Sequence, residues 1–143
     1  MQEIHGDIWD YLGRAIIVIT TNGSLTRDRR AVLGRGVARQ ACSYFPDLPQ
    51  QLGACLLAGG NHVHDLGAGL VSFPVEETAW SLPDLGLIAN SARELRDLIE
   101  LRQWQEIVVP RPGCGGGGLK WQDVRPVLAG CFDQRFLVIS PQP

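Results

Sequence analysis

A buried strand that runs into a glycine-rich loop and then into a helix occurs twice in this chain. The first copy covers residues 16–41 and contains Gly34-Arg35-Gly36, and the second covers residues 107–130 and contains the glycine-rich run from Gly113 to Gly118. Apolar, β-branched runs without alternation indicate strands that are buried on both faces. Such strands alternating with helices predict an α/β fold, a three-layer α/β/α sandwich around a largely parallel, mixed central sheet.

The remaining segments complete this pattern. Further strands are expected at residues 61–66, at residues 69–73, where Pro74 would close the strand, and at residues 136–139. Residues 85–101 predict the best helix, because apolar residues recur there at a period near 3.6, and Pro83-Asp84 is its expected start. The sequence contains no internal repeat or linker, so we expect residues 1–143 to form a single domain.

Composition and charge exclude several classes of protein. Of the 143 residues, 45% are hydrophobic and 20% are charged, which is typical of a soluble globular domain. The formal net charge of −2 argues against a protein that holds nucleic acid mainly by its charge. No apolar run approaches the roughly 18 residues that a membrane span needs, and the N-terminal residues lack the features of a signal peptide. The four cysteines form no Cys-x-x-Cys pair, which favours reduced thiols in a cytoplasmic protein.

The two glycine loops predict a site for phosphate groups. Loops that follow parallel strands lie beyond the carboxyl ends of the sheet, where ligands bind. Glycine allows the backbone to turn and to approach phosphate oxygens closely, and the helix that follows adds free N–H groups and its dipole. Two such loops side by side would suit a diphosphate. The alternative is that both loops are flexible turns, since neither is a Walker A motif or a dinucleotide fingerprint.

The order and spacing of several motifs resemble the macrodomains, a family that binds ADP-ribose. The chain has Gly6-Asp7-Ile8, then a strand ending at Thr20-Thr21-Asn22, then Gly34-Arg35-Gly36-Val37, and finally Pro110-Arg111-Pro112-Gly113-Cys114-Gly115-Gly116-Gly117-Gly118. The last motif continues into Leu119-Lys120-Trp121. This is similar to the branch that contains terminal ADP-ribose protein glycohydrolase and the DNA ADP-ribosyl glycohydrolase antitoxins.

The resemblance implies a role for each motif. Asp7 would accept a hydrogen bond from the adenine amino group, and the backbone of Ile8 would contact the same ring. Asn22 would bind hydroxyls of the distal ribose, and Thr21 beside it is a further candidate ligand-binding residue. The diphosphate and distal ribose would be wrapped by the two glycine loops, made of Gly34, Arg35, Gly36 and Val37 and of Gly113, Cys114, Gly115, Gly116, Gly117 and Gly118. No metal and no cofactor is implied.

Three departures from the family pattern bear on activity. Ile19 stands where the first asparagine of the Val-Asn-x-x-Asn motif is usual. Glu76 and Gly117 stand where the hydrolase branch carries its lysine and its supporting aspartate. Because a glutamate cannot form the Schiff base that lysine forms, and glycine cannot transfer a proton, the lysine-dependent mechanism is not expected here. Lys120, the single lysine of the sequence, lies three residues beyond Gly117 and is the one candidate that would rescue this chemistry. Glu76 is the candidate general base for an alternative attack by water, and the structural alternative is a solvated carboxylate at a strand end.

The resemblance leaves three functions open. The first is a module that binds ADP-ribose or an ADP-ribosylated protein or nucleic acid. The second is a hydrolase that removes ADP-ribose from such a molecule by activated water, and the third, which the acidic charge balance disfavours, is an RNA-binding accessory domain. We expect a monomer that does not associate with membranes.

Other residues admit both a functional and a structural interpretation. His62, His64 and Asp65 have the spacing of metal ligands on a strand but also that of surface residues at a strand end. Cys114 lies near a helix start, which would lower its pKa and make it a nucleophile, but no histidine partner is identifiable, so a small residue packed under the loop is the preferred interpretation. Trp80 and Trp121 would either stack on a base or sugar or pack at the rim of the core.

Overall fold

The computed structural model describes residues 1–142, which form one six-stranded sheet in the order β1-β6-β5-β2-β4-β3. The strands are β1 (Gln2–His5), β2 (Ile16–Asn22), β3 (His64–Asp65), β4 (Leu70–Glu76), β5 (Ile107–Pro110) and β6 (Phe136–Ser140). All neighbouring strands pair in parallel except β3, which is antiparallel to β4. The predicted mixed, largely parallel sheet is therefore confirmed.

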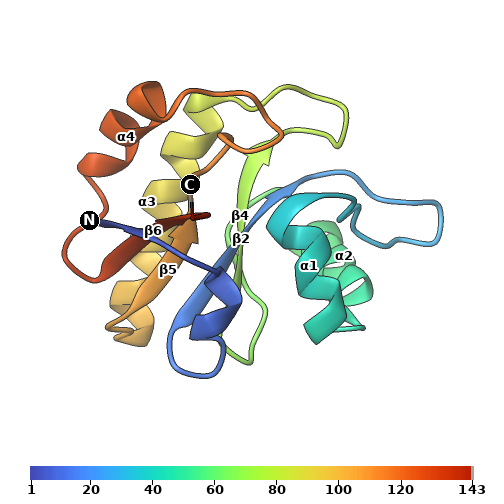
Figure 1. The fold of residues 1–143 in the computed structure, drawn as a ribbon. Coiled ribbons are helices and arrows are strands. Elements are labelled where there is room, and N and C mark those ends of the chain that lie inside the picture. The colour runs from blue at the N-terminus through green and yellow to red at the C-terminus, as the bar shows by residue number, and fades with distance from the viewer. Residues whose placement is uncertain (143) are drawn as a thin grey trace.

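Helices cover both faces of this sheet (Figure 1). They are α1 (Gly36–Tyr44), α2 (Leu48–Gly59), α3 (Leu85–Arg102) and α4 (Trp121–Ala129), and a short 3-10 helix spans Ile8–Tyr11. The helices α3 and α4 lie on one face, and α1, α2 and the 3-10 helix lie on the other. None of the helices within residues 1–142 has both the length and the apolar character needed to cross a membrane.

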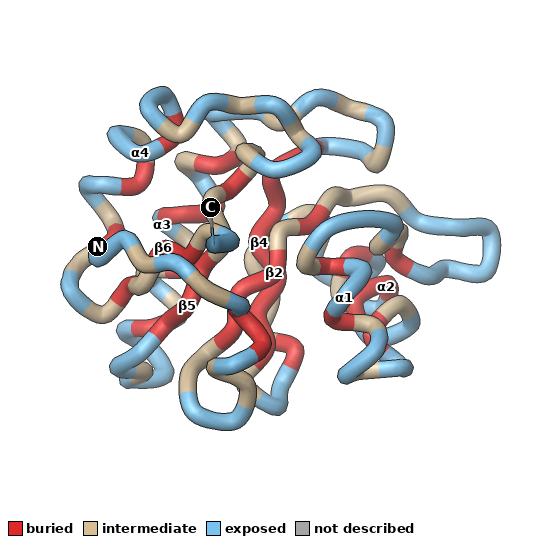
Figure 2. Tube along the Cα trace, viewed as in Figure 1, coloured by how far each residue is buried: buried red, intermediate tan, exposed pale blue. Residues whose placement is uncertain are grey.

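Two hydrophobic cores lie between these layers, one on each face of the sheet. The buried residues shown in Figure 2 run along the central strands, and every residue of β4 is buried. Alternate side chains of one strand enter different cores: Val18 belongs to the core under α3 and α4, whereas Ile17 and Ile19 belong to the other. This explains why the central strands are continuously apolar instead of alternating.

The prediction that Pro74 closes its strand was wrong. β4 continues through Pro74 to Glu76, paired with β2. On its other side β4 pairs with β3 only at Val71 and Ser72, so no strand pairs with Pro74 on that side. Such a position tolerates a proline, because no second strand needs the backbone N–H that proline lacks.

The expected strand at residues 61–66 was too long, and one strand was missed. Only His64–Asp65 pair as β3, because the Glu94 carboxylate accepts a hydrogen bond from the Val63 N–H at 2.9 Å and contacts the His62 ring at 2.7 Å. β1 was not predicted, because it is an edge strand whose residues are mostly exposed and carry no apolar signal. By contrast, α3 begins where expected, with the Asp84 carboxylate accepting from the Gly86 N–H at 2.7 Å.

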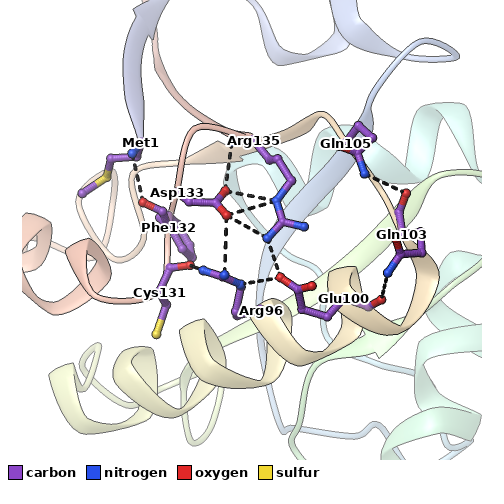
Figure 3. A network of polar contacts seen from close by, with 9 residues as sticks. All are labelled: Met1, Arg96, Glu100, Gln103, Gln105, Cys131, Phe132, Asp133 and Arg135. Atoms are coloured by element: carbon purple, nitrogen blue, oxygen red, sulfur yellow. Dashed lines mark hydrogen bonds and ion pairs between the residues drawn. The ribbon is translucent and has the colours of Figure 1, made fainter.

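A polar network joins α3 to the segment before β6 (Figure 3). The Arg135 guanidinium donates to both carboxylate oxygens of Asp133 and to Glu100, at distances of 2.6 to 3.1 Å. Arg96 donates to the Cys131 carbonyl and to Glu100. Hydrogen bonds from Arg135 hold the pKa of Asp133 and that of Glu100 below their ordinary values, so both carboxylates favour the folded state when ionised.

Candidate ligand-binding site

Both glycine loops lie at the same end of the sheet because the strands before them are neighbours. β2 and β5 pair in parallel, with Ile16 opposite Ile107 and Ile17 opposite Val108. The loops border one cleft of about 600 Å³, which is within the roughly 300 to 1,000 Å³ that ligand sites occupy. The prediction that the loops come together beyond the carboxyl ends of the strands is confirmed.

The first loop presents the start of α1 to the cleft. Gly34, Arg35, Gly36 and Val37 all line it, and Gly36 has a positive φ of 63° that favours glycine. No side chain caps the helix, whose N-cap residue is Arg35. The first N–H groups of α1 are therefore available to an anion, and the helix dipole favours negative charge at this point.

The second loop is anchored at one end and open in its middle. The Leu119 N–H donates to the Gly113 carbonyl at 2.9 Å, which closes the loop. A Cβ on Gly113, whose φ is 73°, would lie 2.8 Å from Leu119 Cδ1 and 3.1 Å from Pro83 Cβ. Gly115 and Gly116 line the cleft with open space around them. The loop therefore offers backbone to a ligand in a conformation fixed at Gly113.

The predicted loop residues are nearly all at the cleft. Gly113, Cys114, Gly115, Gly116 and Gly117 line it, whereas Gly118 is not among the lining residues. In Figure 1 this loop, drawn in orange after β5, lies beside the segment between β4 and α3, in agreement with the contacts of Pro83.

The Gly117 position has no room for a side chain. A Cβ there would lie 2.6 Å from Pro83 Cγ and 2.7 Å from the Gly113 carbonyl oxygen. The hydrolase branch carries its supporting aspartate at the position that aligns with Gly117. The loop of this chain is therefore built around the glycine, and an aspartate there would force the loop to move.

Cys114 is a packed thiol. Its Sγ donates to the Pro112 carbonyl at 3.4 Å, and it contacts the core under α3 and α4. Burial raises the pKa of the Cys114 thiol, with a smaller opposing effect from Arg111. A nucleophilic cysteine needs a lowered pKa, so the structure favours the packing interpretation.

Asp7 and Ile8 line a second hollow of about 840 Å³ that continues the first. The two share Val37, Gln40 and Pro110 in their walls. Ile8 is buried, while Asp7 is exposed and its Oδ1 accepts a hydrogen bond from the Trp9 N–H at 2.9 Å. Asp7 thus caps the 3-10 helix with one oxygen and also lines the hollow, and its hydrogen bond to adenine stays a prediction.

Thr21, Asn22 and Glu76 meet at the other end of the cleft. Asn22 lies opposite Glu76 in the pairing of β2 with β4, and all three residues line the cleft. The Asn22 side chain donates to the Val32 carbonyl at 3.1 Å and accepts from the Ser24 N–H at 2.9 Å. Asn22 therefore fixes the loop after β2, and its role toward a ribose stays a prediction.

Glu76 is buried and paired, which the sequence did not indicate. The whole residue is 8% exposed, and the carboxylate Oε2 accepts a hydrogen bond from Arg35 Nη2 at 2.9 Å. The Asn61 amide donates to the Glu76 carbonyl oxygen at 3.1 Å. The alternative of a solvated carboxylate at a strand end is wrong, because Glu76 lies in the wall of the cleft.

A further part of the wall pairs Trp121, a candidate from the sequence, with Arg111, which the sequence reasoning did not assign. Both line the cleft, and the Arg111 guanidinium lies 5.0 Å from the centre of the Trp121 ring. The Trp121 indole donates to Glu3 at 2.7 Å, and Arg111 lies 3.6 Å from the same carboxylate. The pairing of arginine with tryptophan ten residues apart, around the glycine loop, was the signal that could have revealed this contact.

Three other candidates lie away from the cleft. Trp80 is 85% exposed on the segment between β4 and α3, so it packs neither in the core nor in the cleft wall. Lys120 is exposed and is not a lining residue. His64 contacts the Gly60 carbonyl at 2.9 Å, and no group of three or more histidine, cysteine or acidic side chains suited to a metal occurs among residues 1–142.

Several solved structures are similar to this chain over nearly its whole length. The macrodomain of Thermus aquaticus DarG matches with a TM-score of 0.76 and 22% identity, covering 99% of this chain and 97% of that chain. The macrodomain of Mycobacterium tuberculosis DarG matches with a TM-score of 0.74 and 26% identity, covering 100% and 99%. A structure of Thermosipho africanus DarTG in complex with ADP-ribose matches with a TM-score of 0.74 and 18% identity. This match covers 99% of this chain and 42% of the DarTG chain.

The similarity is detected through structure. No protein-family model matches the sequence, and no curated protein sequence matches it either.

Proposed function

We propose that this chain, which has the macrodomain fold expected from its sequence, binds ADP-ribose in the cleft between its two glycine loops. The observation that carries this proposal is the meeting of the uncapped start of α1 and the open middle of the second glycine loop at one cleft, continued by the hollow at Asp7. The similar DarTG structure that holds ADP-ribose supports the same ligand.

The proposed arrangement places each part of the ligand by its chemistry. The diphosphate lies on the N–H groups of the loops at Gly36 and Gly115, near the cationic side chains of Arg35 and Arg111. Adenine occupies the hollow beside Asp7, which accepts from its amino group. The distal ribose lies toward Asn22 and Glu76, at the opposite end.

The position of the distal ribose extends the proposal to larger ligands. An ADP-ribosylated protein or nucleic acid presents the same group, so we expect the cleft to accept it as a terminal modification. The monomeric state and cytoplasmic location expected from the sequence stay predictions.

A second function, hydrolysis of the ADP-ribosyl bond by activated water, has one observation in its favour. Glu76 is a carboxylate in the wall of the cleft, at the end assigned to the distal ribose. A carboxylate in such a place suits a general base. Release of ADP-ribose from a modified substrate, slowed about 100-fold by Glu76→Gln, would support this function.

A ligand series tests the binding proposal. We expect ADP-ribose to bind more tightly than ADP, and ADP more tightly than AMP, because each step removes a group for which the cleft has a place. Thermal shift and competition titrations measure this order. Equal binding of all three would show that the glycine loops and the far end of the cleft contribute nothing.

A further inference from the structure

Glu76 is the one charged residue that is buried among residues 1–142. Its side chain is 10% exposed, and its ion-pair partner is the Arg35 guanidinium at 2.9 Å. A buried charge needs such a partner, because removal from water is costly unless the charge is paired. The pair joins two elements that the chain separates by 41 positions, the first glycine loop and the end of β4.

Arg35 has a different setting from its partner. Its side chain is 59% exposed, and it projects from the loop between Gly34 and Gly36. Arg35 and Glu76 both line the cleft, so their ion pair lies along the wall that a ligand would contact. A ligand in the cleft therefore meets both members of the pair.

A diphosphate on the first glycine loop would compete for the same guanidinium. Arginine binds phosphate oxygens through two parallel N–H bonds, and such charge-assisted bonds are among the strongest in proteins. Arg35 is the N-cap residue of α1, whose free N–H groups also favour the phosphate. The ligand thus offers Arg35 a partner at its own loop, in place of the Glu76 carboxylate at the end of β4.

We propose that Arg35 is an exchangeable latch, bound to Glu76 in the free protein and transferred to the diphosphate when the ligand binds. The transfer leaves the Glu76 carboxylate free to accept hydrogen bonds from the hydroxyls of the distal ribose. This inference rests on the proposed function, because it needs the diphosphate to lie on the glycine loops. The latch makes the carboxylate available only when a ligand that carries a diphosphate is bound.

ADP is the probe that isolates the latch, since it carries the diphosphate but has no distal ribose to contact Glu76. Breaking the ion pair opposes ADP binding in the wild type. Glu76→Gln removes the charge that holds Arg35, so this variant binds ADP more tightly, by about 3- to 10-fold for a partly exposed pair. Arg35→Gln weakens ADP binding by a similar factor.

The double variant separates the latch from a general effect of charge. If Glu76 acts through Arg35, adding Glu76→Gln to Arg35→Gln changes ADP affinity by less than about twofold. Glu77→Gln is the matched control, because it removes an exposed charge from the next position without touching the pair, and it leaves ADP affinity unchanged.

Calorimetry with ADP and ADP-ribose on the wild type and these four variants decides the matter. Tighter ADP binding by Glu76→Gln alone, lost in the Arg35→Gln background, supports the latch. An unchanged or weaker ADP affinity of Glu76→Gln, or an equal gain in ADP affinity in both backgrounds, overturns the latch. In that case the proposed function still stands if the wild type binds ADP-ribose. If neither wild type nor variants bind either ligand, the proposed function and the latch both fail.

Discussion

Gly113→Ala should destabilise the domain, while Gly115→Ala in the same loop should not. Gly113 has a φ of 73°, and a Cβ there would lie 2.8 Å from Leu119 Cδ1, 3.1 Å from Pro83 Cβ and 3.3 Å from Ile88 Cδ1. A Cβ on Gly115 would have no heavy atom within 4 Å, and its φ is ordinary. The two substitutions therefore add the same methyl group to one loop in opposite surroundings.

The expected cost follows from these two features of Gly113. A non-glycine residue in the left-handed region costs about 1 to 2 kcal/mol, and overpacking a filled site costs about 1 to 3 kcal/mol. The reduced entropy of the unfolded chain returns about 0.4 to 1 kcal/mol. The net loss is about 1 to 5 kcal/mol, a fall in Tm of roughly 3 to 15 °C for a domain of this size.

Urea denaturation and thermal unfolding, both followed by circular dichroism, measure this difference. Gly115→Ala should stay within about 1 kcal/mol of the wild type, because it neither strains the backbone nor meets a neighbour. Equal stability of the two variants would refute the account of the loop, as would a Gly113→Ala protein that unfolds like the wild type.

Three further predictions concern other parts of the molecule. Asp7→Ala should weaken ADP-ribose binding about tenfold by removing a charged acceptor, and should lower the stability by about 1 kcal/mol because the Trp9 N–H loses its cap. Asp7→Asn, measured in parallel, keeps an oxygen to cap the Trp9 N–H and should retain the stability. The free energy of unfolding should be flat above about pH 5 and fall below it. The reason is that the pKa values of Asp133 and Glu100 are lowered in the folded state, so the unfolded chain takes up protons at a higher pH than the folded protein does. An Asp133→Asn variant whose stability falls with acid as that of the wild type does would contradict this. Borohydride should trap no sugar adduct on Lys120, the chain's one lysine, because it is exposed and outside the cleft lining, and mass spectrometry that finds such an adduct would restore the lysine mechanism.

The elements that sequence reasoning predicted well are those with a local physical signal. β2 and β5 are short apolar runs that had to be buried on both faces, and α3 combines a helical period with an aspartate N-cap. The adjacency of the two loops followed from the parallel sheet. The predictions of β2, β5 and α3 depended on residues that are close in sequence.

The features that were missed depend on contacts distant in sequence. β1 has mostly exposed residues, and its pairing with β6 joins the two ends of the chain. Pro74 is tolerated because β3 is short, which no local pattern reveals. The Arg35–Glu76 pair required the first glycine loop and the end of β4 to be placed together, and this placement turned a supposed surface carboxylate into the buried charge of the cleft.

The central claim is that the two glycine loops bind the diphosphate of ADP-ribose. Isothermal titration calorimetry of the wild type with ADP-ribose tests it most directly, with Gly36→Val as the comparison, because that residue has a φ of 63° and lines the cleft. We predict a single site with a micromolar Kd, about −8 kcal/mol, and no measurable binding by a folded Gly36→Val variant. Absence of heat with the wild type at millimolar ADP-ribose, or equal affinity in the two proteins, would contradict the claim.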